Sequence, residues 1–309
     1  MFAQLRRNNV SAGSHRIKRM NLSNSVAKNI FLFFALISIF TTIGIIVSLV
    51  KDSAGFFAHV SLKEFLTGTK WTPLFSDPQF GVLPLITGTL VITVLSGIIS
   101  IPIGLLSAIY LSEYAKPRVR KILKPFLEIL AGIPSIVYGF FALTWITPVL
   151  QKLIPQTEIF NAASASIAIG IMTIPLVSSL SEDALKAVPD SLRHGAYALG
   201  STKLETSLKV VVPAAISGIS ASFVLAISRA IGETMIVTIA AGAKPSLTLN
   251  PLESVQTMTA FIVQASQGDN PHGTSGYYAL FAVGLLLFLM TLVLNILSHY
   301  IVEKYREEY

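Results

Sequence analysis

An arginine and a glutamate, Arg229 and Glu233, interrupt an apolar run over residues 214–242 that is long enough to span a bilayer. Four residues separate them, so a continuous helix places both side chains on one face. A charge at the membrane centre costs on the order of 3 kcal/mol by insertion scales, and an ion pair or a watery cavity lowers that cost. Because a guanidinium holds oxyanions by bidentate hydrogen bonds, we predict an anion-attracting site whose affinity Glu233 keeps low by competing for Arg229. A structural ion pair that locks two helices together is the alternative, and Gly232 predicts close approach of a neighbouring helix.

The remaining residues offer little chemistry. Glu128 follows Lys124 by one helical turn and predicts an ion pair at the membrane interface. There is no cysteine, no phosphate-binding G-x-x-x-x-G-K-[ST] loop, no G-x-S-x-G and no H-E-x-x-H. We therefore expect no enzymatic activity and no cofactor in this chain; if ATP drives it, ATP and Mg²⁺ are bound by partner subunits. The histidines lack ligand spacing, so we expect no metal site; they are His15, His59, His194, His272 and His299.

The composition indicates a helical protein that crosses a membrane several times. Of the 309 residues, 52% are hydrophobic and only 13% are charged, against about 25% charged in soluble domains. Several apolar runs reach the roughly 20 residues that a spanning helix needs. We predict an all-α polytopic membrane protein with six transmembrane helices, over residues 30–50, 82–110, 125–150, 161–180, 214–242 and 277–302.

Basic residues set the predicted orientation. They crowd residues 1–28, which carry no acid, and residues 116–124. By the positive-inside rule both segments are cytoplasmic, as are both chain ends and the segment 182–213. The protein is then a multi-pass protein of the cytoplasmic (inner) membrane, in contact with lipid, and its net charge of +7 needs no nucleic acid to explain it. We predict two parts, a disordered basic tail over 1–28 and a transmembrane domain over 29–309 with its core at about 82–303.

Prolines and aromatic residues add two further expectations. Pro102, Pro134 and Pro175 fall within predicted spans. A proline frees a backbone carbonyl and bends its helix, which the bilayer tolerates where neighbouring helices or water satisfy the backbone. Such bends fit a bundle around a path, and they equally fit packing alone. The aromatic residues between 51 and 81, Trp71 among them, predict anchoring at the level of the lipid headgroups.

The cytoplasmic segment before the fifth span is predicted to form two short helices. Asp190 or Ser191 can cap the first, and Gly200 ends it as the residue able to take a left-handed conformation. Thr202 and Glu205 have the spacing of a capping box for the second helix. A polar hairpin joined directly to a span is suited to receiving mechanical work from another protein.

This hairpin resembles the coupling loop of ABC importer permeases, the EAA motif. In that family a glycine is followed thirteen residues later by a proline, with two aliphatic positions before it; here these are Gly200, Val210, Val212 and Pro213. The Glu-Ala-Ala of the motif falls on His194, Gly195 and Ala196, so only its last position matches. The resemblance implies that these residues dock the hairpin into a groove on an ATPase subunit.

Four further stretches resemble the permeases of phosphate importers, specifically the PstC-type subunit. They are residues 131–143 (AGIPSIVYGFFAL), 228–235 (SRAIGETM), 78–90 (PQFGVLPLITGTL) and 257–263 (TMTAFIV). The likeness covers about residues 30–305. It implies the type I (MetI-like) importer permease fold and a complex with a PstA-like permease, two ATP-binding subunits and an extracytoplasmic phosphate-binding protein. In the family an arginine and a glutamate of the fifth span are implicated in phosphate passage, and these match Arg229 and Glu233.

The expected function is that of a transmembrane permease subunit of an ATP-driven inorganic phosphate importer, forming half of the translocation path and coupling to ATPase subunits. A permease for another oxyanion, such as sulfate or molybdate, is the second hypothesis. An ATP-independent channel or carrier is the third, and a structural or signalling membrane subunit is the fourth.

Overall fold

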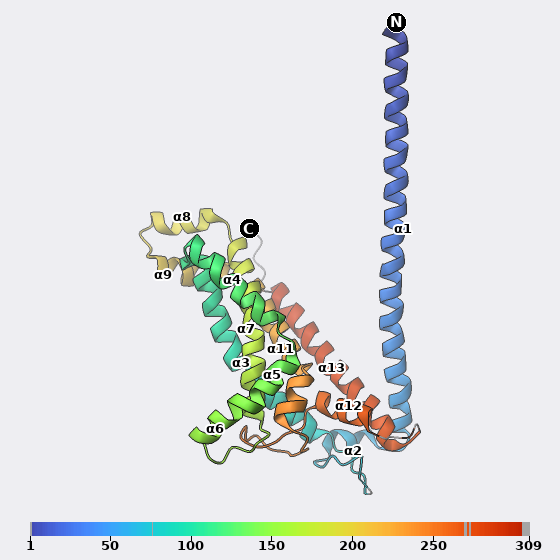
Figure 1. Cartoon of the computed structure of the whole chain (residues 1–309), viewed down its shortest axis with the longest axis vertical. Helices are drawn as coiled ribbons and strands as arrows, with labels where there is room; N and C mark the ends of the chain where they lie inside the picture. Colours follow the sequence, from blue (N-terminus) through green and yellow to red (C-terminus); the bar gives the residue numbers. More distant parts are fainter. Residues whose placement is uncertain (1, 76, 269–270, 272, 305–309) are drawn as a thin grey trace. The chain divides into compact units, whose positions relative to one another are not determined.

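The computed structural model describes residues 2–75, 77–268, 271 and 273–304 (Figure 1). Regular structure in these residues is helical, and the one β contact they contain is an isolated bridge between Trp71 and Phe80. The chain divides into two units, Met1–Asp52 and Ser53–Tyr309, which are described separately. The expectation that the histidines bind no metal concerns five residues. His272 and the side chains of His15 and His299 lie outside the described part of the chain.

The first unit is helical from residue 2 onwards. It contains most of helix α1 (Phe2–Phe57), whose last residues belong to the second unit. The helix runs through the basic segment 1–28 from its second residue, where a disordered arm was predicted. Its part Val26–Phe57 is long and apolar enough to cross a membrane. Phenylalanines such as Phe31 and Phe40 are exposed along it, as expected of side chains that meet lipid.

The second unit supplies the other candidate spans. With α1, the described residues contain five helices long and apolar enough to cross a membrane, or six if a pair of helices bent by 72° forms one span. The all-α fold is thereby confirmed. The spans are α3 (Leu83–Ile109) with η1 (Tyr110–Tyr114), α5 (Ser135–Phe141) with η2 (Ala142–Ile146) and α6 (Thr147–Leu153), α7 (Ala162–Ala187), α13 (Ser275–Lys304), and the bent pair Lys203–Ala214 and Ile216–Ile231, the second of which is α11.

The third span begins later than predicted. Helix α4 (Pro117–Gly132) is a separate element, and the chain is extended at Ile133 and Pro134 before α5 begins at Ser135. A proline biases the residue before it towards extended backbone, which ends α4 at this point. The predicted span 125–150 therefore combined two separate elements, the apolar second half of α4 and the true candidate span. That candidate span runs over Ser135–Leu153.

Helices α3, α7 and α11 pack together at the centre of the second unit. Glycines allow α3 and α7 to approach closely. A Cβ on Gly104 would lie 2.6 Å from Val177 Cβ, and one on Gly170 would lie 2.9 Å from Ile99 Cβ. Small residues at such crossings permit the backbone contact that holds membrane helices together. The elements that carry the candidate site are thus fixed by close packing.

Aromatic residues from the end of α1 onwards are packed inside the second unit. Phe56, Phe65 and Trp71 are each at most 2% exposed. The Trp71 ring meets Phe261 of α12 (Met258–Gln267) edge-to-face, with centroids 4.9 Å apart. The prediction that these rings anchor at the lipid headgroups is therefore wrong for Phe56, Phe65 and Trp71. Aromatic rings pack favourably edge-to-face when folding brings distant segments together.

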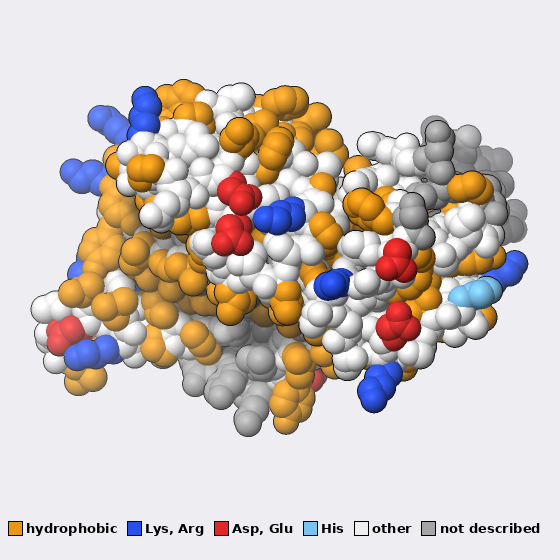
Figure 2. All heavy atoms as spheres, turned by 90° about the horizontal axis from the view of Figure 1, so that it is seen from below, with side chains coloured by type: hydrophobic (Ala, Val, Ile, Leu, Met, Phe, Trp, Pro, Cys, Tyr) orange, Lys and Arg blue, Asp and Glu red, His pale blue; other side chains and the backbone are white. Residues whose placement is uncertain are grey.

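The two ends of the second unit differ in charge. Figure 2 shows the end formed by the loops at the bottom of Figure 1, where acidic and basic side chains are interspersed among hydrophobic and uncharged ones. At the other end lie α8 (Asp190–Ala198), α9 (Lys203–Thr206) and the basic first half of α4. Basic residues of this unit are therefore concentrated beside the hairpin.

Candidate functional site

The hairpin of α8 and α9 is held in shape by local backbone chemistry. Gly200 joins the two helices with φ of +83°, in the left-handed region. Thr202 N–H donates to Glu205 Oε2 (3.0 Å) and Glu205 N–H donates to Thr202 Oγ1 (3.3 Å), which confirms the capping box. Pro189 occupies the N-cap of α8, so the predicted cap at Asp190 or Ser191 is wrong.

The hairpin turns apolar side chains outward. Leu199 is 89% exposed and Leu204 is 59% exposed. The two leucines flank the turn at Gly200 and are available for contact with a partner. Of the residues matched to the EAA motif, most are exposed or half-buried and Ala196 is buried; their role in docking stays a prediction. The exposed ones are His194, Gly195, Gly200 and Pro213, and the half-buried ones are Val210 and Val212.

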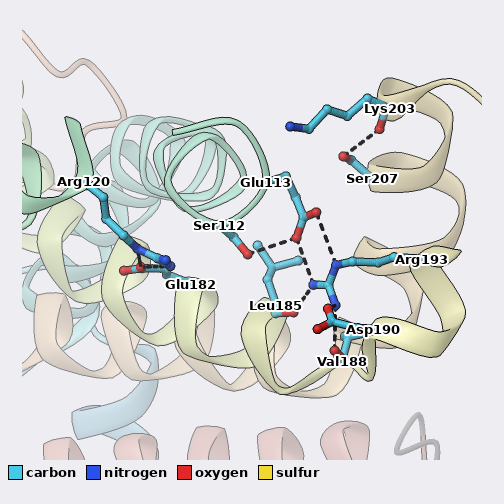
Figure 3. Close-up of polar contacts among 10 residues, drawn as sticks. All are labelled: Ser112, Glu113, Arg120, Glu182, Leu185, Val188, Asp190, Arg193, Lys203 and Ser207. Atoms are coloured by element: carbon cyan, nitrogen blue, oxygen red, sulfur yellow. Dashed lines mark hydrogen bonds and ion pairs between the residues drawn. The ribbon is translucent and has the colours of Figure 1, made fainter. Parts of the chain in front are cut away.

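Arg193 ties the hairpin to the ends of two spans (Figure 3). Its guanidinium donates to Glu113 Oε1 of η1 (2.9 Å) and to the carbonyl oxygens of Leu185 (2.8 Å) and Val188 (2.6 Å) at the end of α7. Both charged side chains are largely buried. The hydrogen bond to Glu113 raises the pKa of Arg193 above its ordinary value. Arg193 therefore links α8 to η1 and to the end of α7.

The fifth predicted span is broken between its two charged residues. Helix α11 ends at Ile231, and Glu233 lies beyond its end. The Glu233 carboxylate accepts hydrogen bonds from the N–H groups of Met235 (3.1 Å) and Ile236 (3.3 Å), so it caps the next helical turn. No ion pair joins it to Arg229 in the described residues. The predicted pairing is wrong because it requires a continuous helix.

Gly232 lies at the break. A Cβ built on it meets only carbonyl oxygens of its own helix, Ser228 at 3.6 Å and Arg229 at 3.9 Å. The prediction of close helix approach at this glycine is therefore wrong, and the residue caps α11 instead. From α12, the Thr259 hydroxyl donates to the Glu233 carbonyl oxygen at 2.7 Å and fixes the chain beyond the break.

Arg229 lines a cavity of about 190 Å³ between α4 and α7. The lining residues of each helix recur every three or four positions, so each helix presents one face to the cavity. Pro175 lies within α7 and is part of this lining. Helix α7 contributes Met172, Pro175, Leu176, Ser179 and Glu182, and α4 contributes Lys124, Leu127, Glu128 and Ala131.

Glu182 carries a cluster of ion pairs at one end of this cavity. Its side chain is 1% exposed. Its Oε1 lies 2.6 Å from Arg120 Nη2 and 2.5 Å from Lys186 Nζ, and its Oε2 lies 3.6 Å from Lys124 Nζ. The predicted pairing of Lys124 with Glu128 is therefore wrong, because the buried carboxylate across the helix interface takes the lysine. Glu128 is exposed and lines the same cavity.

The family described as binding-protein-dependent transport system inner membrane component matches residues 100–307. The chain belongs to this family. The probable ABC transporter permease protein YqgH of Bacillus subtilis is 36% identical over 87% of this chain and 88% of its own length. The phosphate transport system permease protein PstC of Haemophilus influenzae is 32% identical over 92% of this chain and 94% of its own length.

Solved structures of ABC transporters share the fold of this permease. A chain of a bacterial transporter involved in the import of the acidic polysaccharide alginate has a TM-score of 0.62 at 15% identity, covering 93% of this chain and 100% of that chain. A chain of the MetNI methionine transporter in an inward-facing conformation has a TM-score of 0.55 at 19% identity, covering 74% and 95%. The predicted type I importer permease fold is confirmed.

Two charged groups of this permease site were not predicted from the sequence. They are the Glu182 cluster and the pair of Arg193 with Glu113. The available signal was weak: Glu113 and Glu182 are acids next to the ends of long apolar runs, where basic residues predominate. An acid in that position needs a cationic partner or water, and both residues have found a partner.

Proposed function

We propose that this permease is a transmembrane subunit of an ATP-driven importer of inorganic phosphate and forms half of the translocation path. The observation that carries the proposal is the cavity at Arg229, whose lining runs along facing sides of α4 and α7 towards a basic end of the bundle. A guanidinium in such a cavity attracts an oxyanion. Relatives named as phosphate transport system permeases support phosphate as the cargo.

The hairpin end lies in the cytoplasm in this proposal, together with both chain termini. The basic first half of α4 supports this orientation through the positive-inside rule. Of the two ATP-binding subunits, which bind ATP and Mg²⁺, one docks at the exposed leucines Leu199 and Leu204 of this chain. A PstA-like permease completes the path, and an extracytoplasmic phosphate-binding protein delivers the anion from the opposite side.

Coupling follows from the contacts of the hairpin. When the ATP-binding subunits close they displace α8, and the hydrogen bonds of Arg193 carry that displacement to Glu113 on η1 and to the end of α7. Helix α7 lines the cavity. Its movement therefore alters access to Arg229, which meets the anion after the binding protein releases it.

The test is phosphate uptake by the complex reconstituted with its partner permease, ATP-binding subunits and binding protein. We expect Arg229→Gln to lower uptake about tenfold or more, because it removes a charge-assisted contact worth roughly 1.5–3 kcal/mol. Arg229→Lys retains the charge and keeps a larger share of the activity. Arg118→Gln removes an exposed charge of α4 that lines neither the Arg229 cavity nor the neighbouring cavity around Arg120 and Lys186, and it leaves uptake unchanged. Normal uptake by Arg229→Gln in a fully assembled complex rejects the role of Arg229.

Another tetrahedral oxyanion is the second candidate cargo. The cavity offers one guanidinium, and charge alone does not separate phosphate from sulfate or molybdate. Competition of each anion against labelled phosphate during uptake decides between them. Uptake that persists without the ATP-binding subunits supports an ATP-independent carrier and contradicts the proposal.

A further inference from the structure

Lys124 lines two neighbouring cavities. The first is the cavity that contains Arg229. The second is a shallow cavity of about 410 Å³ that is open to the surface; it lies at the basic end of α4 and the end of α7 and is also lined by Arg120, Lys121, Pro125 and Lys186. Lys124 and Glu128 are the two lining residues that both cavities share. The two cavities are therefore consecutive along α4, with Lys124 at their junction.

The junction has an excess of positive charge. Arg120, Lys121, Lys124 and Lys186 face two acids, Glu128 and Glu182. Glu182 is the common partner of three of these cations, so it compensates the charge of one. Lys124 is the most loosely held of the three, at 3.6 Å, whereas Arg120 and Lys186 lie at 2.6 and 2.5 Å. Its side chain is 36% exposed. The Lys124 ammonium can therefore contact an anion in either cavity while Glu182 keeps its two closer partners.

We propose that Lys124 is a second anion contact of the translocation path, which takes phosphate from Arg229 and passes it to the basic cavity. The inference rests on the proposed function and adds a residue to its site. Conduction needs several weak sites in series, since one strong site binds the ion and does not release it. A lysine suits such a step, because its ammonium is a point charge on a flexible stem and does not form the bidentate contact of an arginine.

The absence of cysteine from this chain permits a direct test. Lys124→Cys introduces a unique thiol in a complex assembled with cysteine-free partner subunits. Aminoethyl methanethiosulfonate then restores a positive charge at this position, and methyl methanethiosulfonate adds a neutral group. We expect Lys124→Cys to lower phosphate uptake about tenfold, aminoethylation to restore most of it, and methylation to leave it low.

Two controls separate a contact in the path from a structural ion pair. ATP hydrolysis stimulated by the binding protein should remain near wild type in Lys124→Cys, so that phosphate moved per ATP falls; a proportional fall of both rates in a fully assembled complex overturns the inference. Arg118→Cys with the same reagents should show no change in uptake, because Arg118 lines neither cavity. If Lys124→Cys does not assemble, Lys124→Gln is scored against Lys124→Arg, and equal uptake by these two overturns the inference.

Failure of the Lys124 inference can be distinguished from failure of the proposed function. Normal uptake by Lys124→Cys, beside a loss in Arg229→Gln, overturns the role of Lys124 and leaves the phosphate importer standing. Equal uptake after aminoethylation and methylation shows that charge at position 124 is irrelevant and also overturns it. Normal uptake by both variants rejects the phosphate path through this cavity altogether.

Discussion

Glu182 is the residue whose charge the cavity depends on most. Glu182→Gln keeps the size of the side chain and removes its charge, which leaves Arg120, Lys124 and Lys186 to repel one another. Removing one partner of a fully buried pair costs about 3–5 kcal/mol. We expect a smaller loss of about 1–3 kcal/mol here, since the cations are about one-third exposed and can turn to water. Thermal unfolding in detergent should show a Tm lowered by several degrees.

Glu128→Gln is the matched control for this measurement. Glu128 lines the same cavity but is exposed and makes no ion pair within the described residues. Its substitution should change stability by less than about 0.5 kcal/mol. Equal unfolding temperatures for the two variants contradict the assignment of Glu182 as the compensating charge.

Single residues were predictable where the signal is local. Arg229 stands out in the sequence because an ionised side chain inside an apolar run is costly anywhere along a span. Glu182 does not stand out, since its partner Arg120 lies 62 residues away and only packing of α4 on α7 brings them together. The capping role of Glu233 depends on where Gly232 ends the helix, which spacing alone does not determine.

At the scale of elements, Arg193 joins the hairpin to two spans. Arg193→Ala leaves the largely buried Glu113 without its partner and frees α8 from the end of α7. We expect ATP hydrolysis to continue while phosphate uptake falls several-fold, because the displacement of α8 no longer reaches α7. Amide hydrogen exchange over α8 should also become faster. The measurement is the ratio of phosphate transported to ATP hydrolysed, with hydrogen exchange as the structural readout.

Asp190→Asn provides the matched control for Arg193. It removes the charge of the Asp190 carboxylate, whose Oδ1 lies 3.2 Å from Arg193 Nη1 and whose side chain is 82% exposed. An exposed pair of this kind contributes about 0–1 kcal/mol, so coupling should be retained. Loss of coupling in both variants, or in neither, argues against a specific link through Glu113.

The elements themselves were predictable where short-range chemistry defines them. The turn at Gly200 and the capping box of Thr202 with Glu205 follow from residues within a few positions of one another. The start of the third span was missed because the apolar end of α4 adjoins it, and hydropathy does not separate two apolar segments at Pro134. The break at the end of α11 was missed for the same reason.

At the scale of the whole molecule, hydropathy predicted the spans but not the interior that the loops form with them. Trp71 lies in a mixed segment whose aromatic residues suggested a membrane surface. Its burial depends on Phe261, which is distant in the sequence. The orientation in the membrane also belongs to the whole molecule. It depends on how basic residues are divided between the two ends of the bundle, not on any one helix.

That orientation gives a prediction for the whole chain in its membrane. Because the chain has no cysteine, Leu199→Cys and Leu249→Cys each introduce one thiol at a highly exposed position, 89% and 79% exposed respectively. In right-side-out vesicles a membrane-impermeant maleimide should label Leu249→Cys, in the loop before α12, and leave Leu199→Cys unlabelled until the membrane is opened by detergent. The reverse pattern places the hairpin outside, where ATP-binding subunits cannot reach it, and contradicts the coupling argued from Arg193. Labelling of both variants in sealed vesicles also contradicts it, since the hairpin and this loop would then lie on one side of the membrane.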